Sequence, residues 1–146
     1  MTRITAAQHR VQQASDLAAV LDAAYEAFEA MLSAIHRVQD PASGLFAAFV
    51  MAAASAANGR NAVAPAPSLP RRPLLAVPAG QRPRPGQRPG ERPERLAEVV
   101  AGLSHLVAGR LAQAAACAPD SGDRAACTHA ARSARDICVL LGTGRP

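Results

Sequence analysis

The stretch from Thr5 to Gln39 constrains the fold of this chain more than any other feature. It contains no glycine or proline, and its apolar residues recur every three or four positions along one seam. This period is typical of a helix that packs along its whole length against other helices. At about 1.5 Å per residue, it predicts one helical rod roughly 52 Å long. The seam residues are Ile4, Val11, Ala14, Ala18, Leu21, Tyr25, Phe28, Leu32 and Ile35, flanked by Leu17, Ala24, Met31 and Val38.

Three further helices are predicted in the rest of the chain. The first covers Leu45 to Ala57 and should stop at Asn58-Gly59, because this pair is a usual left-handed helix end. The second covers residues 93–117, where Pro93 suits the first helical position. The third covers residues 121–141, after a polar turn whose side chains can cap it.

The composition favours an all-α fold. Alanine, the best helix former, dominates the apolar fraction, aromatic residues are 3% of the chain, and runs of strand-forming residues are absent. We therefore expect a four-helix bundle made of two antiparallel hairpins, residues 1–60 and 93–146. A linker over residues 61–92 joins them, and both hairpins are expected to pack into a single domain.

The expected second helix, at about 20 Å, is too short to cover the first. It leaves the N-terminal half of the long helix without a partner. We therefore expect a homodimer, or contact with another helical protein, through an interaction face on the first helix. This face consists of Val11, Leu17, Leu21, Tyr25 and Phe28.

Between residues 63 and 92 the sequence becomes rich in proline, glycine and arginine, with a Gly-Gln/Glu-Arg-Pro motif that occurs three times. Few apolar residues are available to offset chain entropy, so this linker is predicted to be disordered or polyproline-like. Seven arginines between residues 71 and 95, against two glutamates, account for the whole net charge of +5. They are Arg71, Arg72, Arg82, Arg84, Arg88, Arg92 and Arg95.

The arginines of the linker allow an alternative function. They could bind nucleic acid or an anionic surface by salt-sensitive attraction. The linker has no aromatic residue on which bases could stack, and a solubilising spacer explains the same composition.

All sixteen basic residues of the chain are arginine, which together with the excess of alanine, glycine and proline indicates a GC-rich bacterial genome. The first residues carry no continuous apolar segment, so we expect a cytoplasmic protein without a signal sequence. The uncharged stretch from Leu45 to Ala57 is too short to span a bilayer.

Cys117, Cys127 and Cys138 form no CxxC motif and are interpreted as small buried hydrophobic residues. An antiparallel hairpin could bring Cys117 close to Cys127. With His105, they are the candidate ligands for a second alternative, a small helical carrier of a metal or another ligand. No cofactor is expected.

No catalytic constellation is found in the sequence. Asp22, Glu26 and Glu29 share one face of the predicted long helix and are interpreted as a solvated acidic strip that the arginine-rich linker could contact. Phosphate-binding glycine loops, Gly-x-Ser-x-Gly elbows, Glu-x-x-His pairs and HExxH are absent. The leading expectation is a non-enzymatic interaction or scaffold protein that acts through helix packing.

Overall fold

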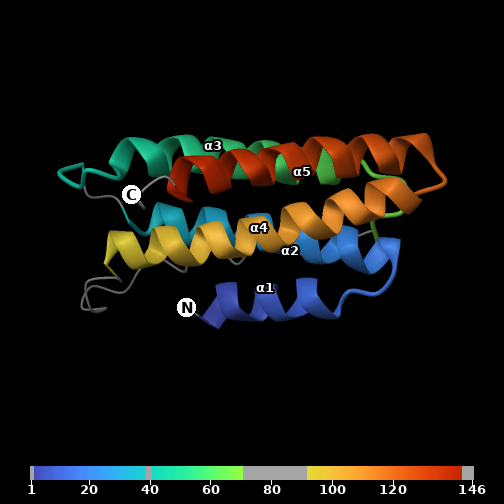
Figure 1. Cartoon of the computed structure of the whole chain (residues 1–146), viewed down its shortest axis with the longest axis horizontal. Coiled ribbons are helices and arrows are strands. Elements are labelled where there is room, and N and C mark those ends of the chain that lie inside the picture. Colours follow the sequence, from blue (N-terminus) through green and yellow to red (C-terminus); the bar gives the residue numbers. More distant parts are fainter. Residues whose placement is uncertain (1, 39–40, 71–91, 143–146) are drawn as a thin grey trace, which may run out of the picture.

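The computed structural model describes residues 2–38, 41–70 and 92–142, and these residues form five helices without a strand (Figure 1). The all-α prediction is confirmed, but the helices number five rather than the four that we expected. They are α1 (Thr2–Gln13), α2 (Leu17–His36), α3 (Phe46–Val63), α4 (Pro93–Cys117) and α5 (Ser121–Gly142).

The prediction of a single rod over residues 5–39 is wrong, because the chain turns back between α1 and α2. Asp16 has an extended backbone, with φ −122° and ψ 169°, and its carboxylate accepts a hydrogen bond of 2.7 Å from the backbone N–H of Ala19. Aspartate is favoured at this position because its side chain satisfies an N–H that the start of a helix leaves without a partner. The result is two antiparallel helices that lie side by side (Figure 1).

The predicted end of α3 is also wrong, since the helix continues through Asn58 and Gly59 to Val63. Gly59 lies against the ring of Phe28, and a Cβ added at Gly59 would meet Phe28 Cζ at 2.4 Å. Phe28 is among the largest fully buried side chains. The glycine therefore marks a close contact between α3 and α2 rather than a helix end.

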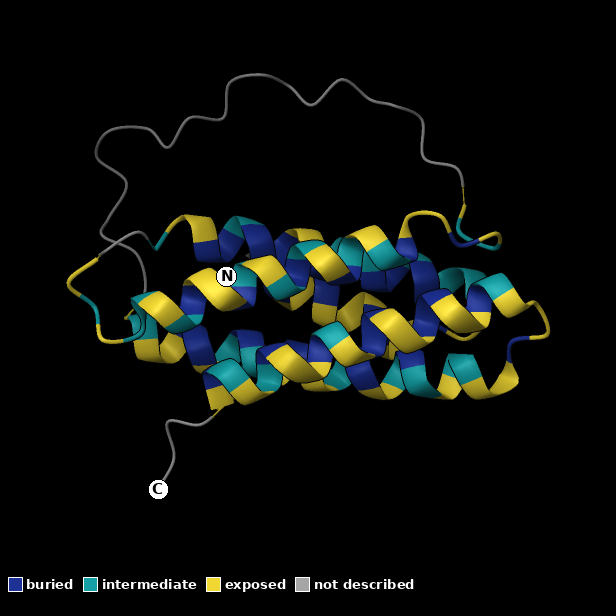
Figure 2. Ribbon diagram, turned by 90° about the horizontal axis from the view of Figure 1, so that it is seen from above, coloured by how far each residue is buried: buried dark blue, intermediate teal, exposed yellow. Residues whose placement is uncertain are grey.

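The five helices pack as neighbours around one apolar core. α4 packs along α5, α5 along α3, and α3 along α2, while α1 contacts both α2 and α4. Buried residues face the interior and exposed residues face outward (Figure 2). Among the largest fully buried side chains are Phe28, Phe49, Leu21, Met31, Leu103, Leu111 and Ile137.

The order of the helices gives a structural reason for the long connection before α4. α3 and α4 run in the same direction, so the end of α3 and the start of α4 lie at opposite ends of the molecule (Figure 1). The chain between them has to cross about the length of α4, roughly 37 Å for its 25 residues. Of the linker predicted over residues 61–92, residues 71–91, which hold the proline repeats, lie outside the described residues, whereas residues 61–63 belong to α3.

By length and composition alone, α4 is the one helix among the described residues that could cross a membrane. In this fold one side of α4 lies in the core that it forms with α1, α2 and α5. The buried side chains on that side include Leu96, Val100, Leu103, Val107 and Leu111. α4 therefore contributes one face to the core.

A buried carboxylate holds the segment after α3 to the start of α5. Asp123 is 1% exposed, and its oxygens accept hydrogen bonds from the backbone N–H of Ser68 at 2.9 Å and from the Ser68 hydroxyl at 2.6 Å. Asp120 caps α5 as predicted, since its Oδ1 accepts from the N–H of Gly122 at 2.7 Å. The first part of the predicted linker, around Ser68, is thus fixed to the first turn of α5, and the disorder predicted for it is wrong.

Candidate functional site

The interaction face that we expected on the first helix lies within the fold. Val11, Leu21 and Phe28 are buried, and Leu17 and Tyr25 are partly buried against the same core. α1 returns along α2 and α4, so a second subunit is not needed to cover this region. The structure removes the reason for a dimer through this face, and dimerisation itself stays a prediction.

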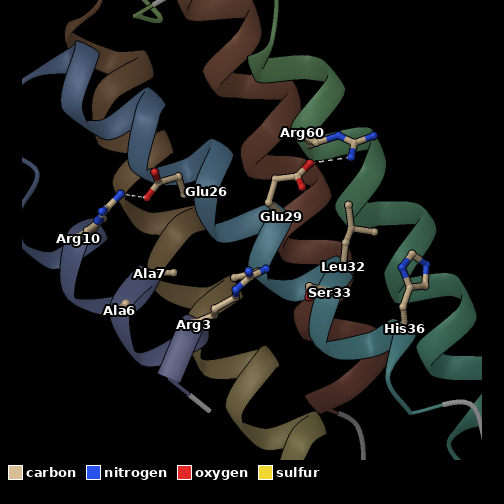
Figure 3. Close-up of a pocket in the computed structure, with 11 residues that line it drawn as sticks. Arg3, Ala6, Ala7, Arg10, Glu26, Glu29, Leu32, Ser33, His36 and Arg60 are labelled. Atoms are coloured by element: carbon tan, nitrogen blue, oxygen red, sulfur yellow. Dashed lines mark hydrogen bonds and ion pairs between the residues drawn. The ribbon is translucent and has the colours of Figure 1, made fainter. Parts of the chain in front are cut away.

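A groove of about 580 Å³ lies between α1, α2 and α3 (Figure 3). This volume is in the range of small-molecule pockets. Its apolar lining consists of Ala6, Ala7, Ala30 and Leu32, and its polar lining consists of Arg3, Arg10, Glu26, Glu29, Ser33, His36 and Arg60.

Two ion pairs border the groove and connect neighbouring helices. Arg10 of α1 pairs with Glu26 of α2, and Arg60 of α3 pairs with Glu29 of α2 at 2.7 Å. The predicted acidic strip on α2 therefore carries contacts between helices. Because the four side chains are 28–60% exposed to solvent, each pair contributes at most about 1 kcal/mol to stability.

The remaining polar groups of the groove do not converge on one point. Arg3 extends from α1, whereas the ring of His36 lies on the side next to α3, with Leu32 between them in the view of Figure 3. A specific small-molecule site needs a few polar groups aimed at the same ligand. We therefore interpret this groove as incomplete packing between α1 and α3. Incomplete packing on this side weakens the attachment of α1 to the rest of the fold.

One face of α3 is apolar and exposed, and sequence reasoning missed it. Ala47, Val50, Met51 and Ala54, here called the α3 row, repeat at helical spacing, and all four are exposed. Val50 is 53% and Met51 is 58% exposed; in the part of the chain that the structure describes, Val139 of α5 is the other large apolar side chain exposed to this degree. The sequence could have indicated this face, because α3 is apolar on nearly every side, and a helix with this pattern is typically packed against other helices on all sides.

An apolar cavity of about 530 Å³ adjoins the α3 row. Val50 belongs to both, so the row and the cavity form one continuous apolar surface where the end of α2 meets the start of α3. The other residues that line the cavity are Ile35, His36, Val38, Pro41, Phe46, Phe49 and Ala53.

The three cysteines are free thiols in different environments: Cys117 is exposed, Cys127 is buried and Cys138 is partly buried, so the interpretation as a buried residue is wrong for Cys117. Burial raises the pKa of the Cys127 thiol, the Asp123 carboxylate raises it further, and burial also raises the pKa of Cys138. His105 is exposed on α4. Within residues 2–38, 41–70 and 92–142, no three His, Cys, Asp or Glu side chains are placed to hold one metal ion, so Cys117, Cys127 and His105 form no such group.

Two of the candidate anion-binding arginines are described. Arg92 and Arg95 are exposed at the start of α4. The other five, Arg71, Arg72, Arg82, Arg84 and Arg88, lie outside the described residues.

Comparison of the chain with protein-family models, with curated proteins and with solved structures finds no match. The function has therefore to be inferred from the helices and their exposed surfaces.

Proposed function

We propose that this protein is a non-enzymatic helical interaction protein that associates with a second copy of itself through the α3 row. The observation that carries this proposal is the exposure of Val50 and Met51 between two further exposed apolar residues, Ala47 and Ala54. Single exposed apolar side chains are common on monomeric proteins and need no explanation. A contiguous row at helical spacing is typical of a helix face that packs against another helix.

The sizes of the side chains in the α3 row favour a second copy as the partner. The row reads small, large, large, small, and is symmetrical about the point between Val50 and Met51. A two-fold axis through this point would place Ala47 of one copy against Ala54 of the other, and Val50 against Met51. Such an isologous contact uses the same patch on both copies.

The properties of the row also predict the character of the dimer. It spans roughly 10 Å of helix, so the contact is small and the association weak and reversible. No charged residue lies between Phe46 and Ala57. The dimer should therefore depend on protein concentration and change little with salt, because screening acts on charges.

Sedimentation across a range of concentrations tests the proposal with a matched pair of variants. Met51→Glu places a carboxylate in the contact and should remove association through the α3 row, so that the dimer fraction falls. Val139→Glu makes a comparable change at the exposed apolar position of α5 and should leave the dimer intact. A wild-type protein that stays monomeric at every concentration would refute the proposal, as would a Met51→Glu variant that dimerises like wild type.

A further inference from the structure

The apolar seam of α1 continues into α2 in helical phase, although the chain turns between the two helices. Ile4, Ala7, Val11 and Ala14 are buried at steps of three and four residues. Leu21 of α2, also buried, follows Ala14 by seven positions, which is two helical turns. The sequence therefore fits both the observed turn and a continuous helix.

The turn itself contains nothing that forbids a straight helix. It consists of Ala14, Ser15 and Asp16, without glycine or proline. Among the described residues, the turn is supported by the hydrogen bond that the Asp16 carboxylate accepts from the N–H of Ala19. Short hinges between packed elements are the places where protein copies exchange those elements.

The contacts that hold α1 to its own chain are modest. Isolated helices of about 12 residues are marginal in water, so α1 depends on packing. Ile4 and Val11 are its large buried side chains. An exposed ion pair joins Arg10 to Glu26, and Arg110 of α4 donates a hydrogen bond of 2.5 Å to the carbonyl oxygen of Gln12. Along its other side runs the groove of about 580 Å³ that separates α1 from α3. α1 is thus well placed to detach without unfolding the other helices.

We propose that two copies of this chain exchange α1, so that α1 of one copy lies on α2 and α4 of the other. In the exchanged dimer the turn straightens and α1 and α2 form the continuous helix that the seam fits. Ile4, Ala7 and Val11 bury the same surface as before, because the acceptor is an identical α2–α4 face. The contact is separate from the α3 row and does not depend on it.

A charge-exchange mixture detects this dimer directly. One protein carries Arg10→Glu and the other carries Glu26→Arg, both in a Met51→Glu background so that contact through the α3 row is removed. Within either protein alone, residues 10 and 26 repel whether α1 is exchanged or not. In a mixed exchanged dimer both pairs become opposite in charge, so the dimer fraction should rise several-fold above that of either protein alone.

The α2–α3 ion pair supplies a control for this mixture. Glu29 and Arg60 lie on helices that stay in the same copy, so mixing Glu29→Arg with Arg60→Glu should not increase the dimer fraction. If the Arg10→Glu and Glu26→Arg proteins sediment in mixture as the average of the two alone, α1 is not exchanged and the proposal is wrong.

Hinge variants test the proposal without relying on surface charges. Asp16→Ala removes a cap that only the turned form needs. An N-cap changes a helix equilibrium by about fivefold, so the two hinges of a dimer should together raise the dimerisation constant about 25-fold. Ser15→Pro should lower it below the wild-type value, because proline in a continuous helix clashes with the carbonyl of Val11, whereas Ser15 lies between the two helices in the turned form. Equal dimerisation of both variants would overturn the proposal.

Discussion

Replacing Gly59 with alanine tests the closest contact between helices in the core. The added methyl carbon would lie 2.4 Å from Cζ and 2.5 Å from Cε1 of Phe28, and real Cβ contacts essentially never fall below 3.0 Å. The Phe28 ring is 0% exposed, so it has no solvent-facing position to move into. Overpacking of this kind costs about 1–3 kcal/mol, and the better helix propensity of alanine returns about 0.5–1 kcal/mol. We expect a net loss of about 1–2 kcal/mol in the free energy of unfolding.

Gly102 of α4 is the matched control for this substitution. It is exposed, and a Cβ added there would meet nothing within 4 Å, so Gly102→Ala should stabilise the protein by about 0.5–1 kcal/mol. Urea denaturation followed by circular dichroism measures both variants. Phe28→Leu, combined with Gly59→Ala, should recover part of the loss in a double-mutant cycle. If Gly59→Ala is as stable as Gly102→Ala, the close packing of α3 on α2 is refuted.

Three further predictions concern the buried polar and thiol groups. Asp123→Ala removes both hydrogen bonds from Ser68 and should lower the free energy of unfolding by about 1–3 kcal/mol, with a smaller loss for Ser68→Ala, as measured by urea denaturation. Native Cys117 should react with a maleimide faster than Cys127 and Cys138, which mass spectrometry after a short exposure can detect; equal rates would contradict the burial. Because the pKa values of Cys127 and Cys138 are raised, the folded state holds the thiol protons more tightly than the unfolded state. The contribution of these thiols to stability is complete below the ordinary thiol pKa of 9.0 and is lost as the pH rises above that value. Cys127→Ala should reduce this alkaline loss.

The boundaries of α4 and α5 could be predicted because local signals mark their ends. Pro93 occupies the first turn of α4, and Asp120 supplies the cap for α5 through its own side chain. These interactions involve residues close in sequence. They do not depend on where the rest of the chain lies.

The turn between α1 and α2 carries a signal of the same kind, the Asp16 cap, but the sequence pattern does not decide between this turn and a continuous helix. Ala14, Ser15 and Asp16 are all compatible with a helix interior, and the seam keeps its phase through them. The turn is stabilised by tertiary packing, because it lets Ile4 and Val11 bury themselves within one chain. A pattern of apolar residues shows which face of a segment is buried. It does not show whether that face packs against another part of the same segment, as α2 does against α1, or against a different helix.

The exposure of the α3 row could not be predicted for the same reason, because the sequence does not show which helices pack against α3. Val50 and Met51 look like core residues in sequence, because α3 is apolar on almost every side. They are exposed because α3 packs along α2 and α5 and no other helix of the described residues covers this face. Likewise, Gly59 indicates a helix end in the sequence, and only the position of Phe28 in the fold shows that it marks a close contact between helices.

The most direct test of the central claim is sedimentation of the wild-type protein over a concentration range at low and high salt, with ultraviolet absorbance recorded alongside interference. The chain has one tyrosine and no tryptophan, so bound nucleic acid would dominate the ultraviolet signal. A contact through the α3 row predicts a concentration-dependent dimer that is insensitive to salt and free of nucleic acid. A monomer at all concentrations, or a species that carries nucleic acid until salt removes it, would contradict this account and favour the arginines of the linker as the functional element.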